Sequence, residues 1–117
     1  MSSKPRKWKF RLRHVLEAID RIEAYTSGLT VDQMAADRQR LDAVVWNLTV
    51  IGEAVRHIPD TVVSSYPEVP WSQMRGIRNR IVHEYDRLDT DIIWNVVQNE
   101  LPPLIPVLQR ILLEAAE

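Results

Sequence analysis

Residues 30–58, TVDQMAADRQRLDAVVWNLTVIGEAVRHI, are the stretch that decides the fold. Its apolar side chains recur at steps of three, four and seven residues, which is the spacing of one face of an α-helix. Thr30 and Gln33 have the spacing of a capping box that begins a helix, and Pro59 disfavours helical geometry in the residue before it. The stretch predicts one helix of about 27 residues. Its buried stripe consists of Met34, Leu41, Val44, Leu48, Ile51, Val55 and Ile58.

Helical periodicity continues toward the N-terminus. An apolar stripe from Leu12 to Ile22 predicts a first helix that closes near Gly28, a residue that readily takes the left-handed conformation. Gly52 lies inside the helix that follows, where glycine costs about 1 kcal/mol relative to alanine. We therefore expect another helix to cross closely at Gly52.

The second half of the chain is predicted to hold two more helices. Residues 59–70 contain three prolines and predict a connection with at most one short helical turn. A third helix is expected from residues 70–71 to residues 83–85. Asp89 and Asp91 begin a fourth, which Pro102, Pro103 and Pro106 should kink or break because each proline removes a backbone donor. Its apolar stripe consists of Ile93, Val97, Leu101, Leu104, Leu108 and Leu112.

No segment alternates with a period of two for long enough to form a sheet, so the predicted class is all-α. Four main helices with short connections favour an antiparallel, up-and-down four-helix bundle. At 117 residues the chain is expected to form a single domain.

The net charge of −1 hides an uneven distribution. Residues 1–13 carry six positive charges, whereas residues 14–117 hold nine arginines against all 16 acidic residues, a balance of −7. A general polyanion-binding surface is therefore excluded, and phosphate chemistry should be confined to one place. The basic N-terminus, residues 1–7, is either a flexible solvated end or an electrostatic arm beside a nucleic-acid site.

Several kinds of site and location are excluded by what the sequence lacks. It has no cysteine, no signal peptide and no apolar run long enough to span a membrane, which favours a reducing cytoplasm. The three glycines are too scattered for a phosphate loop, and no serine has the context of a nucleophile elbow. His14, His57 and His83 lack metal-ligand spacing. We expect no cofactor and no metal.

The segment 71–85, WSQMRGIRNRIVHEY, is unusually polar for a helix that must also pack. On one continuous helix Arg78 and Tyr85 would lie within about 20° of each other. Asn79 and His83, four residues apart, would share the adjacent stripe. One helix face would then present a cation, an amide, an imidazole and a phenol.

Such a set suits cleavage of RNA by the neighbouring 2′-hydroxyl. Histidine has the pKa for proton transfer near neutral pH, and arginine holds phosphate through a planar, permanently charged fork. The nucleophile belongs to the substrate, so no metal is required. One motif histidine per chain is too few for separate acid and base roles, which favours a symmetric dimer with two motif helices facing across a cleft.

The alternative is purely structural, because Arg, His and Tyr on one helix usually form surface pairs. Arg75 and Arg80 are candidates for RNA phosphate contacts, but these two and Arg87 are each individually compatible with simple solvation. Asp89 and Asp91 are explained by the start of a helix.

The pattern Arg78-Asn79-x-x-x-His83-x-Tyr85 resembles the signature of HEPN ribonucleases, and its extended form that of HepT-like toxins. The resemblance covers about residues 8–115, and the ordered set is far more specific than the short signature. The other matching segments are Asn47-Leu48-x-x-Ile51-Gly52-Glu53-Ala54, Pro59, Tyr66-Pro67-Glu68-Val69-Pro70-Trp71 and Met74-Arg75-Gly76-Ile77.

The resemblance implies a helical bundle that dimerises across the motif helix. It also implies that Arg78 and His83 are the catalytic residues, with Asn79 in support. The usual partner of such proteins is a minimal nucleotidyltransferase that acts as antitoxin and transfers AMP to the motif tyrosine, here Tyr85. Glu84 departs from the family, which often has glycine there, and adds negative charge beside the site.

Three functions remain open at this point. The first is a ribonuclease toxin, which the complete Arg-Asn-His-Tyr set favours. The second is a non-catalytic HEPN dimer that binds a nucleotidyltransferase, which Glu84 and the acidic body favour. The third is a structural bundle with a solvated polar face, which a monomeric state in solution would favour.

Overall fold

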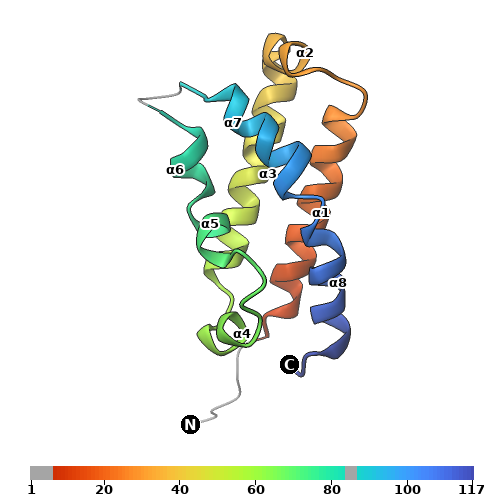
Figure 1. Ribbon diagram of the computed structural model, residues 1–117, viewed down its shortest axis with the longest axis vertical. Coiled ribbons are helices and arrows are strands. Elements are labelled where there is room, and N and C mark those ends of the chain that lie inside the picture. Colours follow the sequence, from red (N-terminus) through yellow and green to blue (C-terminus); the bar gives the residue numbers. More distant parts are fainter. Residues whose placement is uncertain (1–6, 84–86) are drawn as a thin grey trace.

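The computed structural model describes residues 7–83 and 87–117 (Figure 1). Within these ranges the secondary structure is helical, apart from one isolated antiparallel bridge between Val82 and Leu88. The predicted all-α class is therefore confirmed. In chain order the elements are α1 (Lys9–Thr26), α2 (Val31–Ala36), α3 (Arg38–Arg56), α4 (Asp60–Ser65), α5 (Trp71–Arg75), α6 (Ile77–Ile81), α7 (Thr90–Asn95), the π-helix η1 (Val96–Glu100) and α8 (Leu104–Glu114).

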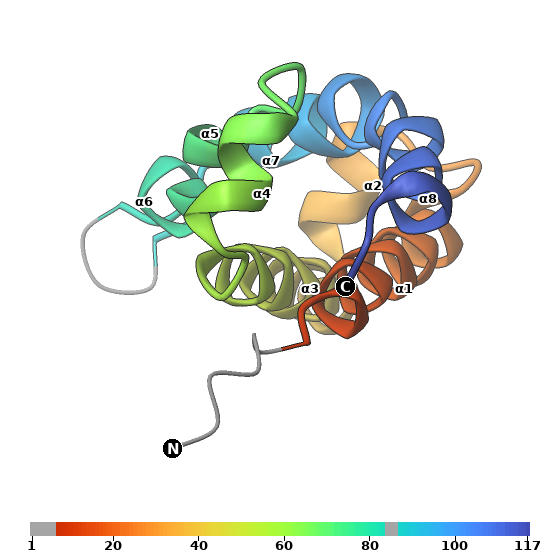
Figure 2. The same ribbon diagram turned by 90° about the horizontal axis from the view of Figure 1, so that it is seen from below.

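The helices α1 and α3 are the long elements of the fold and lie side by side along most of their length (Figures 1 and 2). The end of α1 follows the prediction: Thr26 closes its last turn by donating to the Ile22 carbonyl at 2.8 Å, and Gly28 takes a φ of 76°. The predicted capping box then begins α2, with Thr30 and Gln33 each accepting from the other's backbone N–H.

The prediction of one continuous helix over residues 31–58 is wrong, because the chain leaves helical geometry at Asp37 (φ −101°, ψ 93°). The Asp37 carboxylate accepts from the Arg40 N–H at 3.1 Å and so caps α3. An aspartate within a continuous helix would not make this hydrogen bond. The apolar stripe nevertheless crosses the break, since Met34 and Leu41 are both buried. Every other residue of that predicted stripe is buried as well.

Gly52 permits the close crossing that was predicted from its position. A Cβ atom there would lie 3.2 Å from the Met74 carbonyl oxygen and 3.3 Å from Cγ2 of Ile77. Both α5 and α6 pack against α3 at this point. The crossing holds the segment that carries the sequence motif against the longest helix of the fold.

The predicted third helix is shorter than expected and is interrupted at Gly76, between α5 and α6. It ends at Ile81, so the prediction that His83 lies on it is wrong. Val82 is extended (φ −108°, ψ 120°), and the His83 N–H donates to the Arg87 carbonyl at 2.7 Å instead of to a carbonyl one helical turn back. The returning chain thus supplies backbone partners that compete successfully with the helix.

The fourth predicted helix begins where expected, with Asp89 accepting from the Ile92 N–H at 3.0 Å. The break at the prolines is confirmed: α7 passes into η1, and Pro102 and Pro103 separate η1 from α8. Pro106 is tolerated in the first turn of α8, where a backbone N–H has no partner within the helix. In the described ranges only α1 and α3 are long and continuous, so the structure confirms the all-helical class but not the four-helix count.

Buried side chains from α1 to α8 form one hydrophobic core. The two described chain ends meet beside it, because the Glu117 carboxylate accepts from the Trp8 and Lys9 N–H groups at 2.8 and 2.6 Å. None of the helices within residues 7–83 and 87–117 combines the length and apolar character that crossing a membrane requires. Residues 1–6 of the predicted basic N-terminus lie outside the described residues.

Candidate active site

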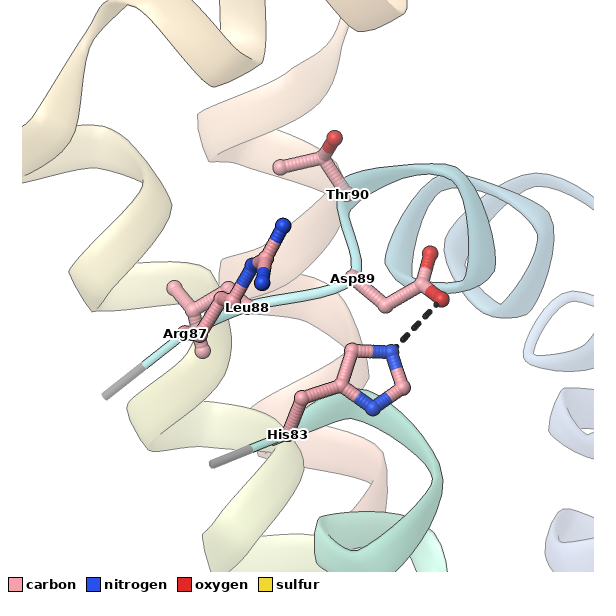
Figure 3. Close-up of a pocket in the computed structure, with 5 residues that line it drawn as sticks. All are labelled: His83, Arg87, Leu88, Asp89 and Thr90. Carbon is pink, nitrogen blue, oxygen red and sulfur yellow. Dashed lines mark hydrogen bonds and ion pairs between the residues drawn. The ribbon is translucent and has the colours of Figure 1, made fainter. Parts of the chain in front are cut away.

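His83 lies just beyond the end of α6, exposed, in an open pocket of about 570 Å³ (Figure 3). The pocket forms where the chain returns antiparallel to residues 82–83 before entering α7. It is lined by His83, Arg87, Leu88, Asp89 and Thr90.

The imidazole of His83 is held by a carboxylate, with its Nε2 at 3.0 Å from Oδ2 of Asp89 (Figure 3). Asp89 uses its other oxygen, Oδ1, to cap α7 through Ile92. The Ile92 N–H, followed by the His83 ring, lowers the pKa of Asp89 below its ordinary value. Asp89 is therefore a carboxylate at neutral pH, and it links the start of α7 to the histidine.

The sequence identifies Asp89 as a helix cap but does not predict its contact with His83. The reason is geometric: a helix continued through residue 83 would have carried the imidazole away from the start of α7. The sequence does contain one indication of this contact. Asp89 precedes α7 by one residue and lies only a few residues after His83, so an early end of the motif helix allows the two side chains to meet.

Arg78 and Asn79 lie on α6 and are both exposed. Among the residues that the structure describes, neither side chain forms a hydrogen bond or an ion pair, with His83 or with any other residue. The predicted shared helical stripe of Asn79 and His83 is therefore wrong, since the helix ends between them. Arg87, for which the sequence favours simple solvation, is the arginine that lines the pocket with His83.

Arg80 is engaged within the fold. Its Nη1 and Nη2 atoms donate to the two carboxylate oxygens of Glu100 on η1, at 2.8 and 2.7 Å. This paired interaction raises the pKa of Arg80 and lowers that of Glu100. The fork that would contact RNA phosphate is thus occupied in this structure, and the predicted phosphate contact of Arg80 stays a prediction.

Arg75, the other arginine predicted to contact RNA, ends α5 and is half-buried. Its Nε atom is buried and lacks a hydrogen-bond partner within the described part of the chain. Tyr85, predicted to be modified, and Glu84 both lie outside the described residues.

The open pocket brings an imidazole and a guanidinium group together. An exposed imidazole can exchange a proton with a substrate, and Arg87 beside it can hold an anion. Within residues 7–83 and 87–117, no three histidine or acidic side chains gather closely enough to hold a metal ion. The described groups are suited to proton transfer next to a phosphate.

Comparison with known proteins places the chain in a family. Residues 15–111 match the model of the family described as Ribonuclease HepT-like. A protein of Methanocaldococcus jannaschii named "Putative RNase MJ0127" is 35% identical over 101 residues, which cover 86% of this chain and 84% of the relative. "Probable ribonuclease HepT" of Thermococcus cleftensis is 32% identical over 99 residues, which cover 85% of this chain and 90% of the relative. No solved structure matches the chain. With most of its length matched in this way, the chain belongs to the HepT-like ribonuclease family.

Proposed function

We propose that this protein is a metal-independent endoribonuclease in which His83 transfers a proton and Arg78 stabilises the charge on phosphorus. The observation that carries the proposal is the exposed His83 imidazole, held by Asp89 in an open pocket at the motif position of a ribonuclease family. The names of the relatives support the same reaction class.

The proposed reaction is an internal transfer at phosphorus. His83 accepts the proton of the RNA 2′-hydroxyl, whose oxygen forms a bond to the adjacent phosphorus. The bond from phosphorus to the 5′-oxygen then breaks, and that oxygen takes up a proton. Arginine charge stabilises the phosphorane-like transition state, which carries more negative charge than the substrate. The substrate supplies the nucleophile, so the chemistry needs no metal ion.

The proposal includes a homodimer in which two α6 helices face each other. Each chain brings one motif histidine, whereas the reaction needs both a base and an acid. The exposed Arg78 and Asn79 side chains on α6 are available for such a composite site. Asn79 would then support the catalytic pair across the interface, and Arg75 and Arg80 are proposed to contribute phosphate contacts at its edge.

We further propose that the protein is the toxin of a type VII-like toxin–antitoxin system in the cytoplasm. Its antitoxin would be a minimal nucleotidyltransferase that transfers AMP to Tyr85. Position 85 lies two residues from each of His83 and Arg87, which both line the pocket. An AMP group there would add negative charge and bulk beside these residues and so oppose RNA binding.

The test uses purified protein and expression without an antitoxin. Wild-type protein should cleave RNA in the presence of a metal chelator and arrest growth, whereas His83→Ala should do neither. His57→Ala is the matched control, because His57 is also an exposed histidine beside a carboxylate, Glu53, at 3.3 Å. RNA cleavage by folded His83→Ala at the wild-type rate would overturn the proposal.

The second candidate is a non-catalytic dimer that binds the nucleotidyltransferase. The observation that favours it is the engagement of Arg80 by Glu100, which removes one cation from phosphate binding. Harmless expression and intact RNA for both wild type and His83→Ala, combined with retained binding of the transferase, would select this function.

A further inference from the structure

The two carboxylate oxygens of Asp89 contact different partners. Oδ1 accepts from the Ile92 N–H at 3.0 Å, and Oδ2 lies 3.0 Å from Nε2 of His83. The Asp89 side chain is about one quarter exposed, at 26%, compared with 53% for His83. The cap on α7 therefore fixes the orientation of a carboxylate that the more exposed imidazole then contacts.

The backbone sets the distance between the two residues independently of their side chains. The Val82–Leu88 bridge is flanked by two hydrogen bonds, from the His83 N–H to the Arg87 carbonyl at 2.7 Å and from the Asp89 N–H to the Ile81 carbonyl at 2.8 Å. In this antiparallel pairing His83 lies opposite Arg87 and diagonal to Asp89, so all three share one face. That register explains why these three residues line the same pocket (Figure 3).

The second exposed histidine–carboxylate pair shows what distinguishes this one. His57 and Glu53 are one helical turn apart, and their side chains are 46% and 66% exposed. Within the described residues Glu53 makes no second hydrogen bond, so its carboxylate is not oriented by another group. Asp89 is held by a helix N-terminus, which also favours its negative charge.

We propose that Asp89 is a positioning residue that holds His83 as the Nε2–H tautomer and leaves Nδ1 as the base. The proposal rests on the proposed ribonuclease function and deepens it. A carboxylate only accepts hydrogen bonds, so the ring nitrogen that faces it must carry the proton. In a neutral imidazole the other nitrogen then has the free lone pair.

The proposed step balances without any further reagent. The 2′-hydroxyl proton moves to Nδ1, the 2′-oxygen bonds to phosphorus, and the 5′-oxygen leaves with its electron pair and takes a proton from the protonated motif histidine of the second chain in the proposed dimer. His83 becomes an imidazolium, and Asp89 stays ionised and stabilises the new charge. The hydrogen bonds from Ile92 and His83 that lower the pKa of Asp89 keep it ionised throughout.

The variant Asp89→Asn separates the role of Asp89 in orienting His83 from its role in capping α7. Asparagine caps helices about as well as aspartate, so α7 should persist. Its neutral amide can also donate a hydrogen bond, so it no longer dictates which ring nitrogen carries the proton. We expect kcat for RNA cleavage to fall about 10- to 100-fold, since general base catalysis contributes about 10²- to 10⁴-fold. KM should stay within about twofold because no substrate contact is removed.

The matched control is Asp37→Asn. Asp37 caps α3 in the same way, through the Arg40 N–H at 3.1 Å, but its other oxygen contacts Arg40 instead of a histidine. This variant should keep the wild-type kcat. Asp89→Ser, which also keeps a capping side chain, serves as the second variant if Asp89→Asn does not fold.

The direct readout is the tautomer of His83, measured from the ring nitrogen signals of ¹⁵N-labelled protein. Wild type and Asp37→Asn should show His83 with the proton on Nε2, and Asp89→Asn should shift it toward Nδ1. An unchanged tautomer, or a wild-type kcat in Asp89→Asn, would overturn the inference. If wild-type protein cleaves no RNA, the proposed function fails while the ring spectra alone still decide the role of Asp89.

Discussion

Arg80 on α6 and Glu100 on η1 are joined by two parallel hydrogen bonds, at 2.8 and 2.7 Å, between residues twenty positions apart in the chain. The Asn95 amide donates to the same carboxylate at 3.1 Å. This ion pair ties α6, the helix that ends just before His83, to the π-helix η1. Its two side chains are each about one third exposed, at 33% and 30%.

The first prediction concerns the pH dependence of this ion pair. Arg80 lowers the pKa of Glu100 below its ordinary value of 4.5. The unfolded state therefore binds the proton first as the pH falls, so the stabilisation is present above about pH 4.5 and is lost as the pH falls through the folded-state pKa. Replacing Glu100 with Gln should lower stability at neutral pH by about 1 kcal/mol and flatten this acid dependence.

Thermal unfolding measured from about pH 3 to pH 7 tests this prediction. Asp42→Asn is the control, since the Arg38–Asp42 pair is considerably more exposed, at 60% and 58%. The idea fails if Asp42→Asn and Glu100→Gln change the pH profile equally.

The second prediction concerns the helix crossing at Gly52. Alanine would gain helix propensity, but its Cβ would press on the Met74 carbonyl and on Ile77 at 3.2 and 3.3 Å. Because a backbone atom cannot move away cheaply, we expect Gly52→Ala to destabilise the fold by about 1–3 kcal/mol. In the control Gly76→Ala the new Cβ meets Ser72 at an ordinary 3.5 Å. Equal melting temperatures for the two variants would contradict the close crossing.

The third prediction assigns different roles to two arginines. Arg78→Ala should lower kcat about 10²- to 10³-fold, as expected for loss of a group that stabilises transition-state charge. Arg87 lines the pocket, and we expect it to contact a phosphate of bound RNA. Arg87→Ala should therefore chiefly raise KM and reduce the slope of log affinity against log salt by about 1.

Arg21→Ala is the control for both variants, since Arg21 pairs with Glu17 on the exposed surface of α1. Steady-state cleavage of a short RNA and binding titrations at several salt concentrations provide the readouts. An unchanged KM and salt slope in Arg87→Ala would exclude that arginine from RNA binding.

The fourth prediction concerns regulation at Tyr85. With Tyr85→Phe, the nucleotidyltransferase should no longer attach AMP, and the toxin should stay active when the two proteins are co-expressed. Tyr66→Phe is the control, because Tyr66 follows α4 and is not part of the motif. Mass spectrometry of the purified proteins detects the added AMP. Its presence on Tyr85→Phe, together with neutralisation, would move the modification to another residue.

The helical class and the buried stripes follow from local pattern. Periodic apolar residues have few ways to be removed from water other than on one face of a helix, so the stripe from Met34 to Ile58 could be identified without a structure. The capping box at Thr30 and the cap at Asp89 likewise depend on side chains only three residues from their partners.

Helix boundaries are harder to predict where a residue can either continue the helix or form a different hydrogen bond. Asp37 fits a helix by periodicity, yet in the structure it leaves helical geometry and its carboxylate caps α3. The motif helix could continue past Ile81 by pattern alone. Its end depends on hydrogen bonds between residues 81–83 and residues 87–89, which exist only once the chain has turned back.

The sequence by itself determined that this protein is helical, and its motif identified the arginine, asparagine, histidine and tyrosine on which the function is proposed to depend. Only the tertiary structure decided that His83 leaves the helix, that Asp89 holds its imidazole, and that Arg87 shares its pocket while Arg80 pairs with Glu100. The physical reason is the separation along the chain of the residues that interact. A helical stripe is set by neighbours within one or two turns, whereas each of these contacts joins residues whose distance depends on where the chain reverses.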